Sequence, residues 1–194
     1  MNVALFGTSA DPPTIGHLEI LRWLSHQFDQ VAVWAADNPF KSHQTDLDHR
    51  TRMLQLLVNE LNCPNVRVYP ELSHLRTIVT VDRAQARFPA ATFTLVVGVD
   101  VAKQLPKWHR VAELLDRVQL LVMPRSGYTL SQLELSRLSE LGTPVTIAPI
   151  TVPDVSSTKY REHRSGGVTK AVQAYIDREH LYSCDARAEK QAVH

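Results

Sequence analysis

The sequence lacks the features that define several large classes of protein. It has only two cysteines, Cys63 and Cys184, and they are too far apart for a C-x-x-C motif, so neither a disulfide framework nor a cysteine-based zinc site has support. No apolar run approaches the roughly 20 residues of a membrane helix, and no basic region marks a signal peptide at the N-terminus. We therefore expect a cytoplasmic protein with no membrane partner.

An excess of charge of one sign is also lacking. The 21 Lys and Arg residues balance 20 Asp and Glu residues, which leaves a formal net charge of +1. This balance argues against the broad basic face of a nucleic-acid-binding protein, so any affinity for phosphate must be local. The length of 194 residues suits one domain with a sizeable core, and we expect residues 1–182 to form it. Residues 183–194 lack apolar periodicity, which predicts a flexible tail.

Short apolar runs alternate with helical patterns along most of the chain. The runs predict strands at residues 2–6, 31–35, 66–69, 92–97, 118–123 and 145–148. Apolar spacing predicts a helix that begins near Gly16 and further helices at 47–61, 76–87, 111–115, 130–141 and 168–179. This alternation is typical of α/β proteins, and we predict a Rossmann-like, doubly wound parallel sheet with helices on both faces and a C-terminal helical extension.

The first predicted strand leads into a segment with the marks of a phosphate site. Gly7 permits a turn at the end of the strand, and a helix beginning near Gly16 would point its unpaired N–H groups at an anion. Thr14 and His17, three residues apart, would share a face of that helix start, and Gly16 would let a phosphate approach the backbone. The alternative is that Thr14 is an ordinary helix cap and His17 an ordinary residue of the first turn.

A second candidate phosphate site follows the last predicted strand. Ser156, Ser157 and Thr158 are typical of a helix start, although such residues cap helices without any ligand. Arg161 lies three to four residues further on, so a helix that begins near Ser157 would bring its guanidinium to the same side. An arginine beside a helix start favours a phosphate ligand over a simple cap.

With T-x-G-H at 14–17 and S-S-T-x-x-R at 156–161, the chain resembles the bacterial nicotinate-nucleotide adenylyltransferases of the nucleotidylyltransferase superfamily. The likeness covers nearly the whole chain and includes N-P-F-K at 38–41, V-G-V-D at 97–100, P-R-S-G-Y at 124–128 and the segment 174–182. The chain departs from the commoner pattern at Thr14, where histidine is usual. It departs again at Thr8, which replaces a second glycine and could crowd the triphosphate.

The resemblance implies that the 5′-phosphate of a mononucleotide attacks the α-phosphorus of ATP and expels pyrophosphate. Such a displacement needs alignment and charge neutralisation rather than a protein nucleophile. The resemblance gives the catalytic contacts to His17 on the α-phosphate, Thr14 on the same phosphates and Arg161 on the β and γ groups. The implied ATP-binding residues are Gly7, Thr8, Ser9, Gly16, Gly98, Asp100, Ser156, Ser157 and Thr158. Mg²⁺ would bridge the phosphate oxygens with few protein ligands. The alternative for Asp100 is that it is a helix N-cap.

The acceptor implied by the resemblance is nicotinate mononucleotide, which would give deamido-NAD for NAD biosynthesis. The implied substrate-binding residues are Asn38, Lys41, Arg76, Thr77, Trp108 and Arg125. Trp108 would stack on the pyridine ring, Arg76 could favour the acid by its charge, and Lys41 and Arg125 are candidates for the acceptor phosphate. Without the resemblance, Trp108 is as readily a core or rim residue, and the two cations are surface charges.

Other functions remain open at this stage. The same chemistry could act on nicotinamide mononucleotide or, with less support, on phosphopantetheine. A different class is a nucleotide-binding sensor without catalysis. Thr8 and Thr14 favour this class, whereas the presence of His17 and Arg161 argues against it. The sequence does not determine the oligomeric state and is compatible with a homo-oligomer.

Overall fold

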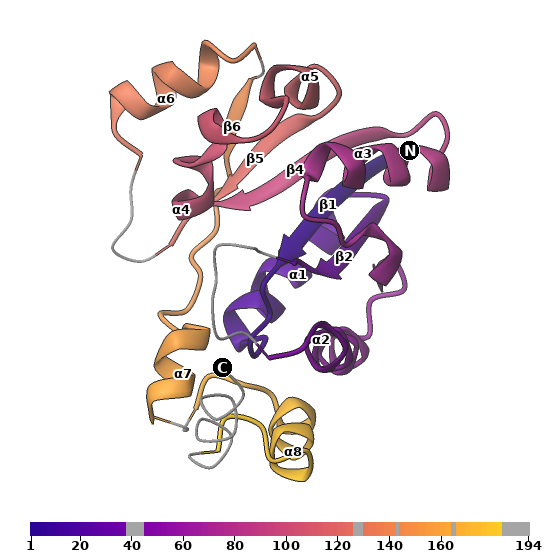
Figure 1. Cartoon of the computed structure of the whole chain (residues 1–194), viewed down its shortest axis with the longest axis vertical. Helices are drawn as coiled ribbons and strands as arrows, with labels where there is room; N and C mark the ends of the chain where they lie inside the picture. The colour runs from indigo at the N-terminus through magenta and orange to yellow at the C-terminus, as the bar shows by residue number, and fades with distance from the viewer. Residues whose placement is uncertain (38–44, 126–129, 143, 164–165, 184–194) are drawn as a thin grey trace, which may run out of the picture.

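The computed structural model describes residues 1–37, 45–125, 130–142, 144–163 and 166–183. Within these residues a six-stranded, all-parallel sheet has the strand order β3-β2-β1-β4-β5-β6 (Figure 1). The strands are β1 (Asn2–Thr8), β2 (Gln30–Ala35), β3 (Val66–Val68), β4 (Thr92–Gly98), β5 (Gln119–Met123) and β6 (Val145–Ile147). The strand order runs outward from β1 to β3 and then returns to β4, so the predicted doubly wound parallel sheet is confirmed.

Helices connect successive strands, and two more follow the last strand, β6. They are α1 (Ile15–Gln27), α2 (Leu47–Leu61), α3 (Thr77–Arg87), α4 (Val99–Ala102), α5 (Val111–Leu115), α6 (Gln132–Ser139), α7 (Ser157–His163) and α8 (Lys170–Arg178). Two 3₁₀ turns, η1 (Pro70–Leu72) and η2 (Leu105–Lys107), complete the described elements. The predicted strands and longer helices are confirmed to within two residues at most ends, whereas α4, η1 and η2 were not predicted.

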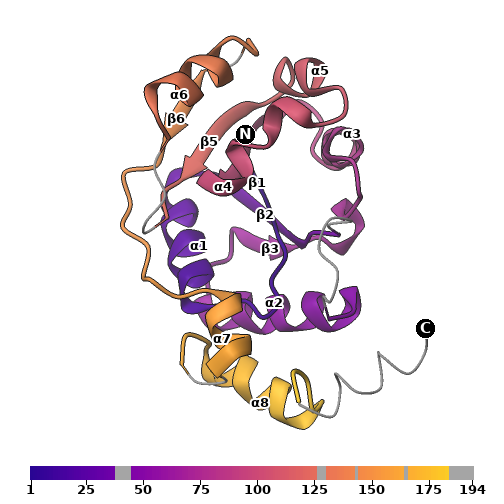
Figure 2. The ribbon, with the colours of Figure 1, turned by 60° about the vertical axis from the view of Figure 1, so that its left-hand side comes forward.

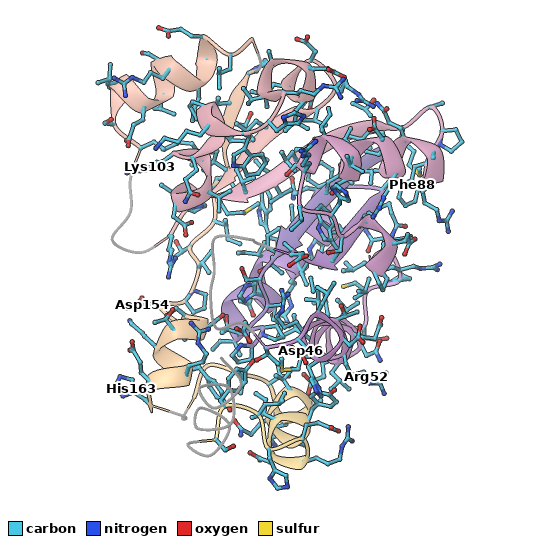
Figure 3. All side chains as sticks on the ribbon, viewed as in Figure 1. Asp46, Arg52, Phe88, Lys103, Asp154 and His163 are labelled. Atoms are coloured by element: carbon cyan, nitrogen blue, oxygen red, sulfur yellow. The ribbon has the colours of Figure 1, made fainter. Side chains whose placement is uncertain are left out.

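The core has one apolar layer on each face of the sheet, because side chains alternate along β1. Val3 and Leu5 belong to a cluster that includes residues of α3 and α5, whereas Ala4 and Phe6 belong to one that includes residues of α1 and α2. Figure 2 shows these two groups of helices around the sheet, and Figure 3 shows side chains filling the space between the layers. The prediction of helices on both faces is therefore confirmed.

The C-terminal helices pack against the layer that contains α2. Tyr160 of α7 and Val172 of α8 are buried in the same cluster as Met53 of α2, and Figure 1 shows both helices at the end of the molecule remote from β6. None of the helices in the described ranges is long and apolar enough to cross a membrane. The tail predicted at 183–194 lies, beyond Ser183, outside the described residues, and a single domain over 1–182 stays a prediction.

Candidate active site

The carboxyl ends of the central strands lie side by side. Phe6 of β1 pairs with Val96 of β4, and both strands end two residues later, at Thr8 and Gly98. Gly98 in turn pairs with Met123, the last residue of β5. The strands before β4 are added on one side of β1, and β4 and later strands are added on the other side. Open α/β sheets bind ligands at this point of reversal, between β1 and β4. The segments that follow these strands therefore converge on one edge of the sheet.

Thr14 and His17 are bonded to each other at the start of α1. Thr14 is the N-cap and is 1% exposed. Its backbone N–H donates to Nδ1 of His17 at 3.0 Å, and its Oγ1 lies 2.9 Å from the same nitrogen. Because Nδ1 accepts a backbone N–H, the proton of the neutral imidazole is placed on Nε2. Thr14 is thus a cap, as the alternative held, and it also makes Nε2 of His17 the hydrogen-bond donor.

Gly7 and Gly16 both lie where neighbouring side chains approach the backbone closely. Gly7 lies inside β1, which continues to Thr8, so the predicted turn at Gly7 is wrong. A Cβ on Gly7 would lie 2.6 Å from the ring of Trp34 in the neighbouring strand β2. A Cβ on Gly16 would lie 3.3 Å from the side chains of Val152 and Val155. Gly16 therefore lets the segment before α7 pack against the start of α1, and its predicted phosphate contact stays a prediction.

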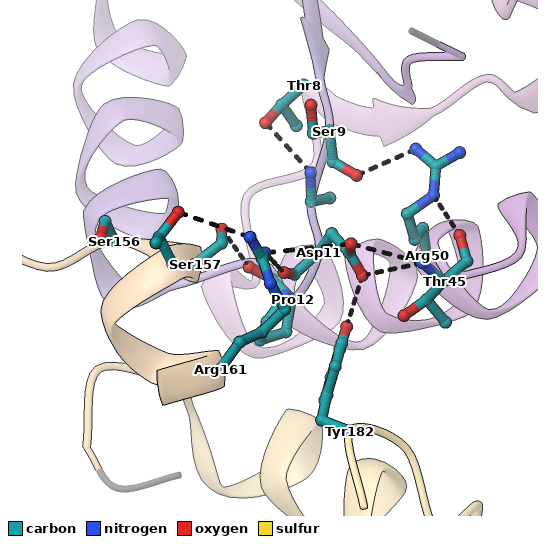
Figure 4. A network of polar contacts seen from close by, with 12 residues as sticks. Thr8, Ser9, Asp11, Pro12, Thr45, Arg50, Ser156, Ser157, Arg161 and Tyr182 are labelled. Carbon is teal, nitrogen blue, oxygen red and sulfur yellow. Dashed lines mark hydrogen bonds and ion pairs between the residues drawn. The ribbon is translucent and has the colours of Figure 1, made fainter. Parts of the chain in front are cut away.

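Thr8 is the last residue of β1, and Ser9 begins the loop that follows. Oγ1 of Thr8 accepts the backbone N–H of Ala10 at 3.4 Å, so the hydroxyl faces its own loop (Figure 4). The carbonyl of Ser9 accepts a bond from Arg50, a residue of α2. Ala10 is fully buried and has a φ of 48°, a left-handed conformation that costs an alanine some strain. The loop is therefore held by a bond within itself and by a bond to α2.

The second motif bonds to the loop that precedes the first, and each of its hydroxyls is bonded inside the protein. Oγ of Ser156 accepts the N–H of Lys159 at 3.1 Å, and Oγ of Ser157 donates to the carbonyl of Pro12 at 2.8 Å. Nη2 of Arg161 donates to Oγ1 of Thr158 at 3.4 Å, and its Nη1 donates to the carbonyl of Asp11 at 2.5 Å (Figure 4). The two motifs, about 140 residues apart in the sequence, thus form one site.

Sequence reasoning missed Asp11, which is 3% exposed at the centre of this junction. Its Oδ1 accepts the hydroxyl of Tyr182 at 2.7 Å, and both carboxylate oxygens lie within 3.4 Å of the backbone nitrogen of Thr45. Its Oδ2 is 3.9 Å from Nη1 of Arg161. Burial is the main cause that raises the pKa of Tyr182, and the negative charge of Asp11 raises it further. The phenol therefore stays protonated and remains a hydrogen-bond donor.

Sequence reasoning also missed Arg50, a buried cation on α2 that is 3% exposed. Its Nη1 donates to the carbonyls of Ser9 at 3.0 Å and Ala36 at 2.6 Å, and its Nε donates to that of Thr45 at 2.8 Å. Burial lowers the pKa of Arg50, and the nearby carboxylate of Asp11 opposes this effect. A signal was present in the sequence, because Arg50 falls at an apolar position of the helical pattern at 47–61.

Asp100 and Arg125 form a pair after β4 and β5. Nη1 of Arg125 lies 3.3 Å from Oδ2 of Asp100, so Arg125 is not an isolated surface charge. The N-cap of α4 is Gly98, so the alternative of Asp100 as the N-cap is wrong. A Cβ on Gly98 would lie 2.8 Å from Oδ1 of Asp100, which shows that the carboxylate folds back over the end of β4.

The remaining acceptor candidates border the α3 side of the sheet. Arg76 is the exposed N-cap of α3 and Thr77 is its first residue. Trp108 is half-buried and packs against the apolar cluster that contains α3 residues, so it contacts the core as the alternative held. The other two candidates, Asn38 and Lys41, lie outside the described residues, and their roles stay predictions.

Comparison with known proteins gives consistent matches over most of the chain. A cytidylyltransferase-like family model matches residues 5–163. A probable nicotinate-nucleotide adenylyltransferase of Synechocystis sp. is 41% identical, with 94% of this chain and 99% of the relative covered. One of Bacillus pumilus is 31% identical, with 93% and 97% covered. The solved structure of Plasmodium falciparum nicotinic acid mononucleotide adenylyltransferase complexed with NaAD has a TM-score of 0.77 at 16% identity, covering 93% of this chain and 97% of that one, a likeness of fold.

Proposed function

Because the chain belongs to the cytidylyltransferase-like family and, within it, to the nicotinate-nucleotide adenylyltransferases, we propose that it transfers AMP from ATP to nicotinate mononucleotide. The products are deamido-NAD, an intermediate of NAD biosynthesis, and pyrophosphate. The observation that carries the proposal is the junction of the two motifs, where Arg161 bonds to the loop that leads to Thr14 and His17. A cytoplasmic location belongs to the same proposal.

His17 is the proposed electrostatic catalyst. An oxygen of the acceptor phosphate forms a bond to the α-phosphorus of ATP, and the bond from that phosphorus to the pyrophosphate oxygen breaks. Negative charge on the α-phosphate oxygens is redistributed during this step, and the proposed role of Nε2 of His17 is to donate a hydrogen bond to one of them. The bond from the Thr14 N–H to Nδ1 supports this role, because it leaves the imidazole proton on Nε2. Thr14 fixes the imidazole through Nδ1, so its contribution to the phosphates acts through His17 as well as by contact.

Arg161 is proposed to bind the β and γ phosphates. Its contacts with Asp11 and Thr158 orient a planar group that carries five N–H donors, which leaves donors for phosphate oxygens. Mg²⁺ would enter with ATP. The carboxylates of Asp11 and Asp100 are engaged by Arg161, Tyr182 and Arg125, so the chemistry of the site fits a cation whose ligands are mostly phosphate oxygens and water.

The choice of acceptor is proposed to depend on residues at the α3 side of the sheet. An exposed cation at Arg76 can attract the pyridine carboxylate of nicotinate mononucleotide, which the amide lacks. Trp108 packs against the same cluster as α3, and its half-exposed ring can stack on a flat heterocycle. The proposed ligands of the acceptor phosphate are Arg125 and Lys41, and Asn38 and Thr77 are further proposed substrate-binding residues.

The test is pyrophosphate release from MgATP with nicotinate mononucleotide, nicotinamide mononucleotide and phosphopantetheine compared side by side. We expect the first to be the best acceptor. Arg76→Gln should narrow the preference for the acid over the amide, whereas Arg87→Gln, an exposed cation at the other end of α3, should leave it unchanged. A preference for the amide or for phosphopantetheine would reassign the acceptor. No pyrophosphate release with any of the three acceptors, despite measurable ATP binding, would favour a nucleotide-binding sensor without catalysis.

A further inference from the structure

The side chain of Asp11 joins three parts of the chain that are far apart in the sequence. It lies in the loop after β1, accepts a bond from Tyr182, which is 171 residues later, and faces Arg161, which is 150 residues later. We propose that Asp11 is a positioning residue that holds Arg161 toward the phosphates of ATP, and that this hold depends on the hydroxyl of Tyr182. The proposal rests on the proposed function, because it assumes that Arg161 binds ATP.

Arg161 contacts Asp11 at two points. Nη1 bonds to the backbone carbonyl and lies 3.9 Å from Oδ2 of the carboxylate. Contact with both atoms of one residue restricts where the guanidinium can rest, and the carboxylate adds an attraction that is strong because Asp11 is only 3% exposed. Replacing the carboxylate with an amide would keep the carbonyl contact and remove the attraction, so the guanidinium would occupy its site less often.

The carboxylate is in turn held by donors on its other side. Tyr182 donates to Oδ1 at 2.7 Å, and the N–H of Thr45 approaches both oxygens. Tyr182 also packs edge-on against Tyr160 of α7, with ring centroids 6.1 Å apart and an interplanar angle of 80°. The same side chain therefore orients the carboxylate and packs against the helix that carries Arg161. Figure 4 shows Tyr182 and Arg161 approaching Asp11 from different directions.

A matched pair of tyrosines separates positioning from simple anchoring. Tyr182→Phe removes the hydroxyl that bonds to Asp11, and Tyr175→Phe removes one that bonds to Nδ1 of His49 at 2.9 Å, between α8 and α2. We expect similar losses of thermal stability. Only Tyr182→Phe should weaken MgATP, roughly 3- to 10-fold in KM and Kd, and Asp11→Asn should lower kcat/KM for ATP on the order of 10- to 100-fold. The KM for the acceptor should change less than twofold in Tyr182→Phe and in Asp11→Asn.

A double-substitution cycle tests whether Asp11 acts through Arg161. In an Arg161→Gln background, Asp11→Asn and Tyr182→Phe should each change MgATP affinity less than twofold, because the group they position is gone. Undiminished effects in that background, or equal ATP affinity for Tyr182→Phe and the unsubstituted chain, would overturn the proposal. Calorimetry of MgATP binding gives these values without an acceptor, so they are read even if the proposed acceptor is wrong. If Asp11→Asn fails to fold, Tyr182→Phe alone decides.

Discussion

Replacing Arg50 with methionine removes a buried cation that bonds to the loop after β1 and to both ends of the segment between β2 and α2. Its guanidinium donates to the carbonyls of Ser9, Ala36 and Thr45 at 3.0, 2.6 and 2.8 Å. Ser9 belongs to the loop after β1, Ala36 follows β2, and Thr45 precedes α2. Methionine keeps a long side chain and the helical preference of the position, so the main change is the loss of the charge and its donors.

The expected loss of stability follows from those three bonds. Hydrogen bonds to a charged group contribute about 1.5–3 kcal/mol each, so together the gross contribution is about 4.5–9 kcal/mol. The cost of burying the cation, which also lowers the pKa of Arg50, offsets part of this gain, and methionine removes that cost. Three carbonyls would still lose their donor. We expect the free energy of unfolding to fall by about 3 kcal/mol, near the lower end of the range for breaking buried charged contacts.

Urea unfolding of Arg50→Met, with Arg52→Met as the control, measures this loss. Arg52 lies two residues away on the same helix and is exposed, and Figure 3 labels it at the periphery of α2. The control should change the free energy of unfolding by about 0.5 kcal/mol or less. Equal losses for the two variants would show that the three carbonyl bonds add nothing beyond the packing of a long side chain, which would refute the reasoning.

Two further predictions concern catalysis. His17→Ala should lower kcat by about 100-fold or more with a smaller effect on ATP binding, as for a lost oxyanion donor, while His26→Ala on the same helix should not; near-normal turnover would remove His17 from the mechanism. Trp108→Ala should weaken the binding of the mononucleotide by about 1–3 kcal/mol if its ring stacks on the pyridine, and an unchanged KM for the acceptor would assign Trp108 to packing alone.

Local patterns predicted most of the fold because they report burial directly. The helix predicted at 47–61 has those bounds in the structure, since its apolar spacing continues without a break to Leu61 and Asn62 then adopts a left-handed conformation. The elements α4, η1 and η2 were missed because three or four residues are too few to show a period. The turn at Gly7 was wrong because the glycine accommodates Trp34, and which side chain lies across a neighbouring strand is not visible in a single segment.

The residues of the site were predicted or missed for the same reason, because only contacts between residues close in the sequence leave a local pattern. Thr14 and His17 are three residues apart at a helix start, so their spacing alone predicted that they would share a face, and they are bonded to each other. Arg50 shows the limit of such reasoning. Its place in an apolar pattern signals burial, but its partners are backbone carbonyls, and every residue has one.

The junction at Asp11 lies beyond local patterns for a further reason. The hydroxyl of Tyr182 and the guanidinium of Arg161 reach Asp11 only because α7 and the segment after α8 return to the carboxyl end of β1. That return depends on the packing of both helices against the α2 layer, which involves the whole core. The motifs therefore identify the groups proposed to contact ATP, whereas the residues that hold those groups in place are determined by the tertiary fold.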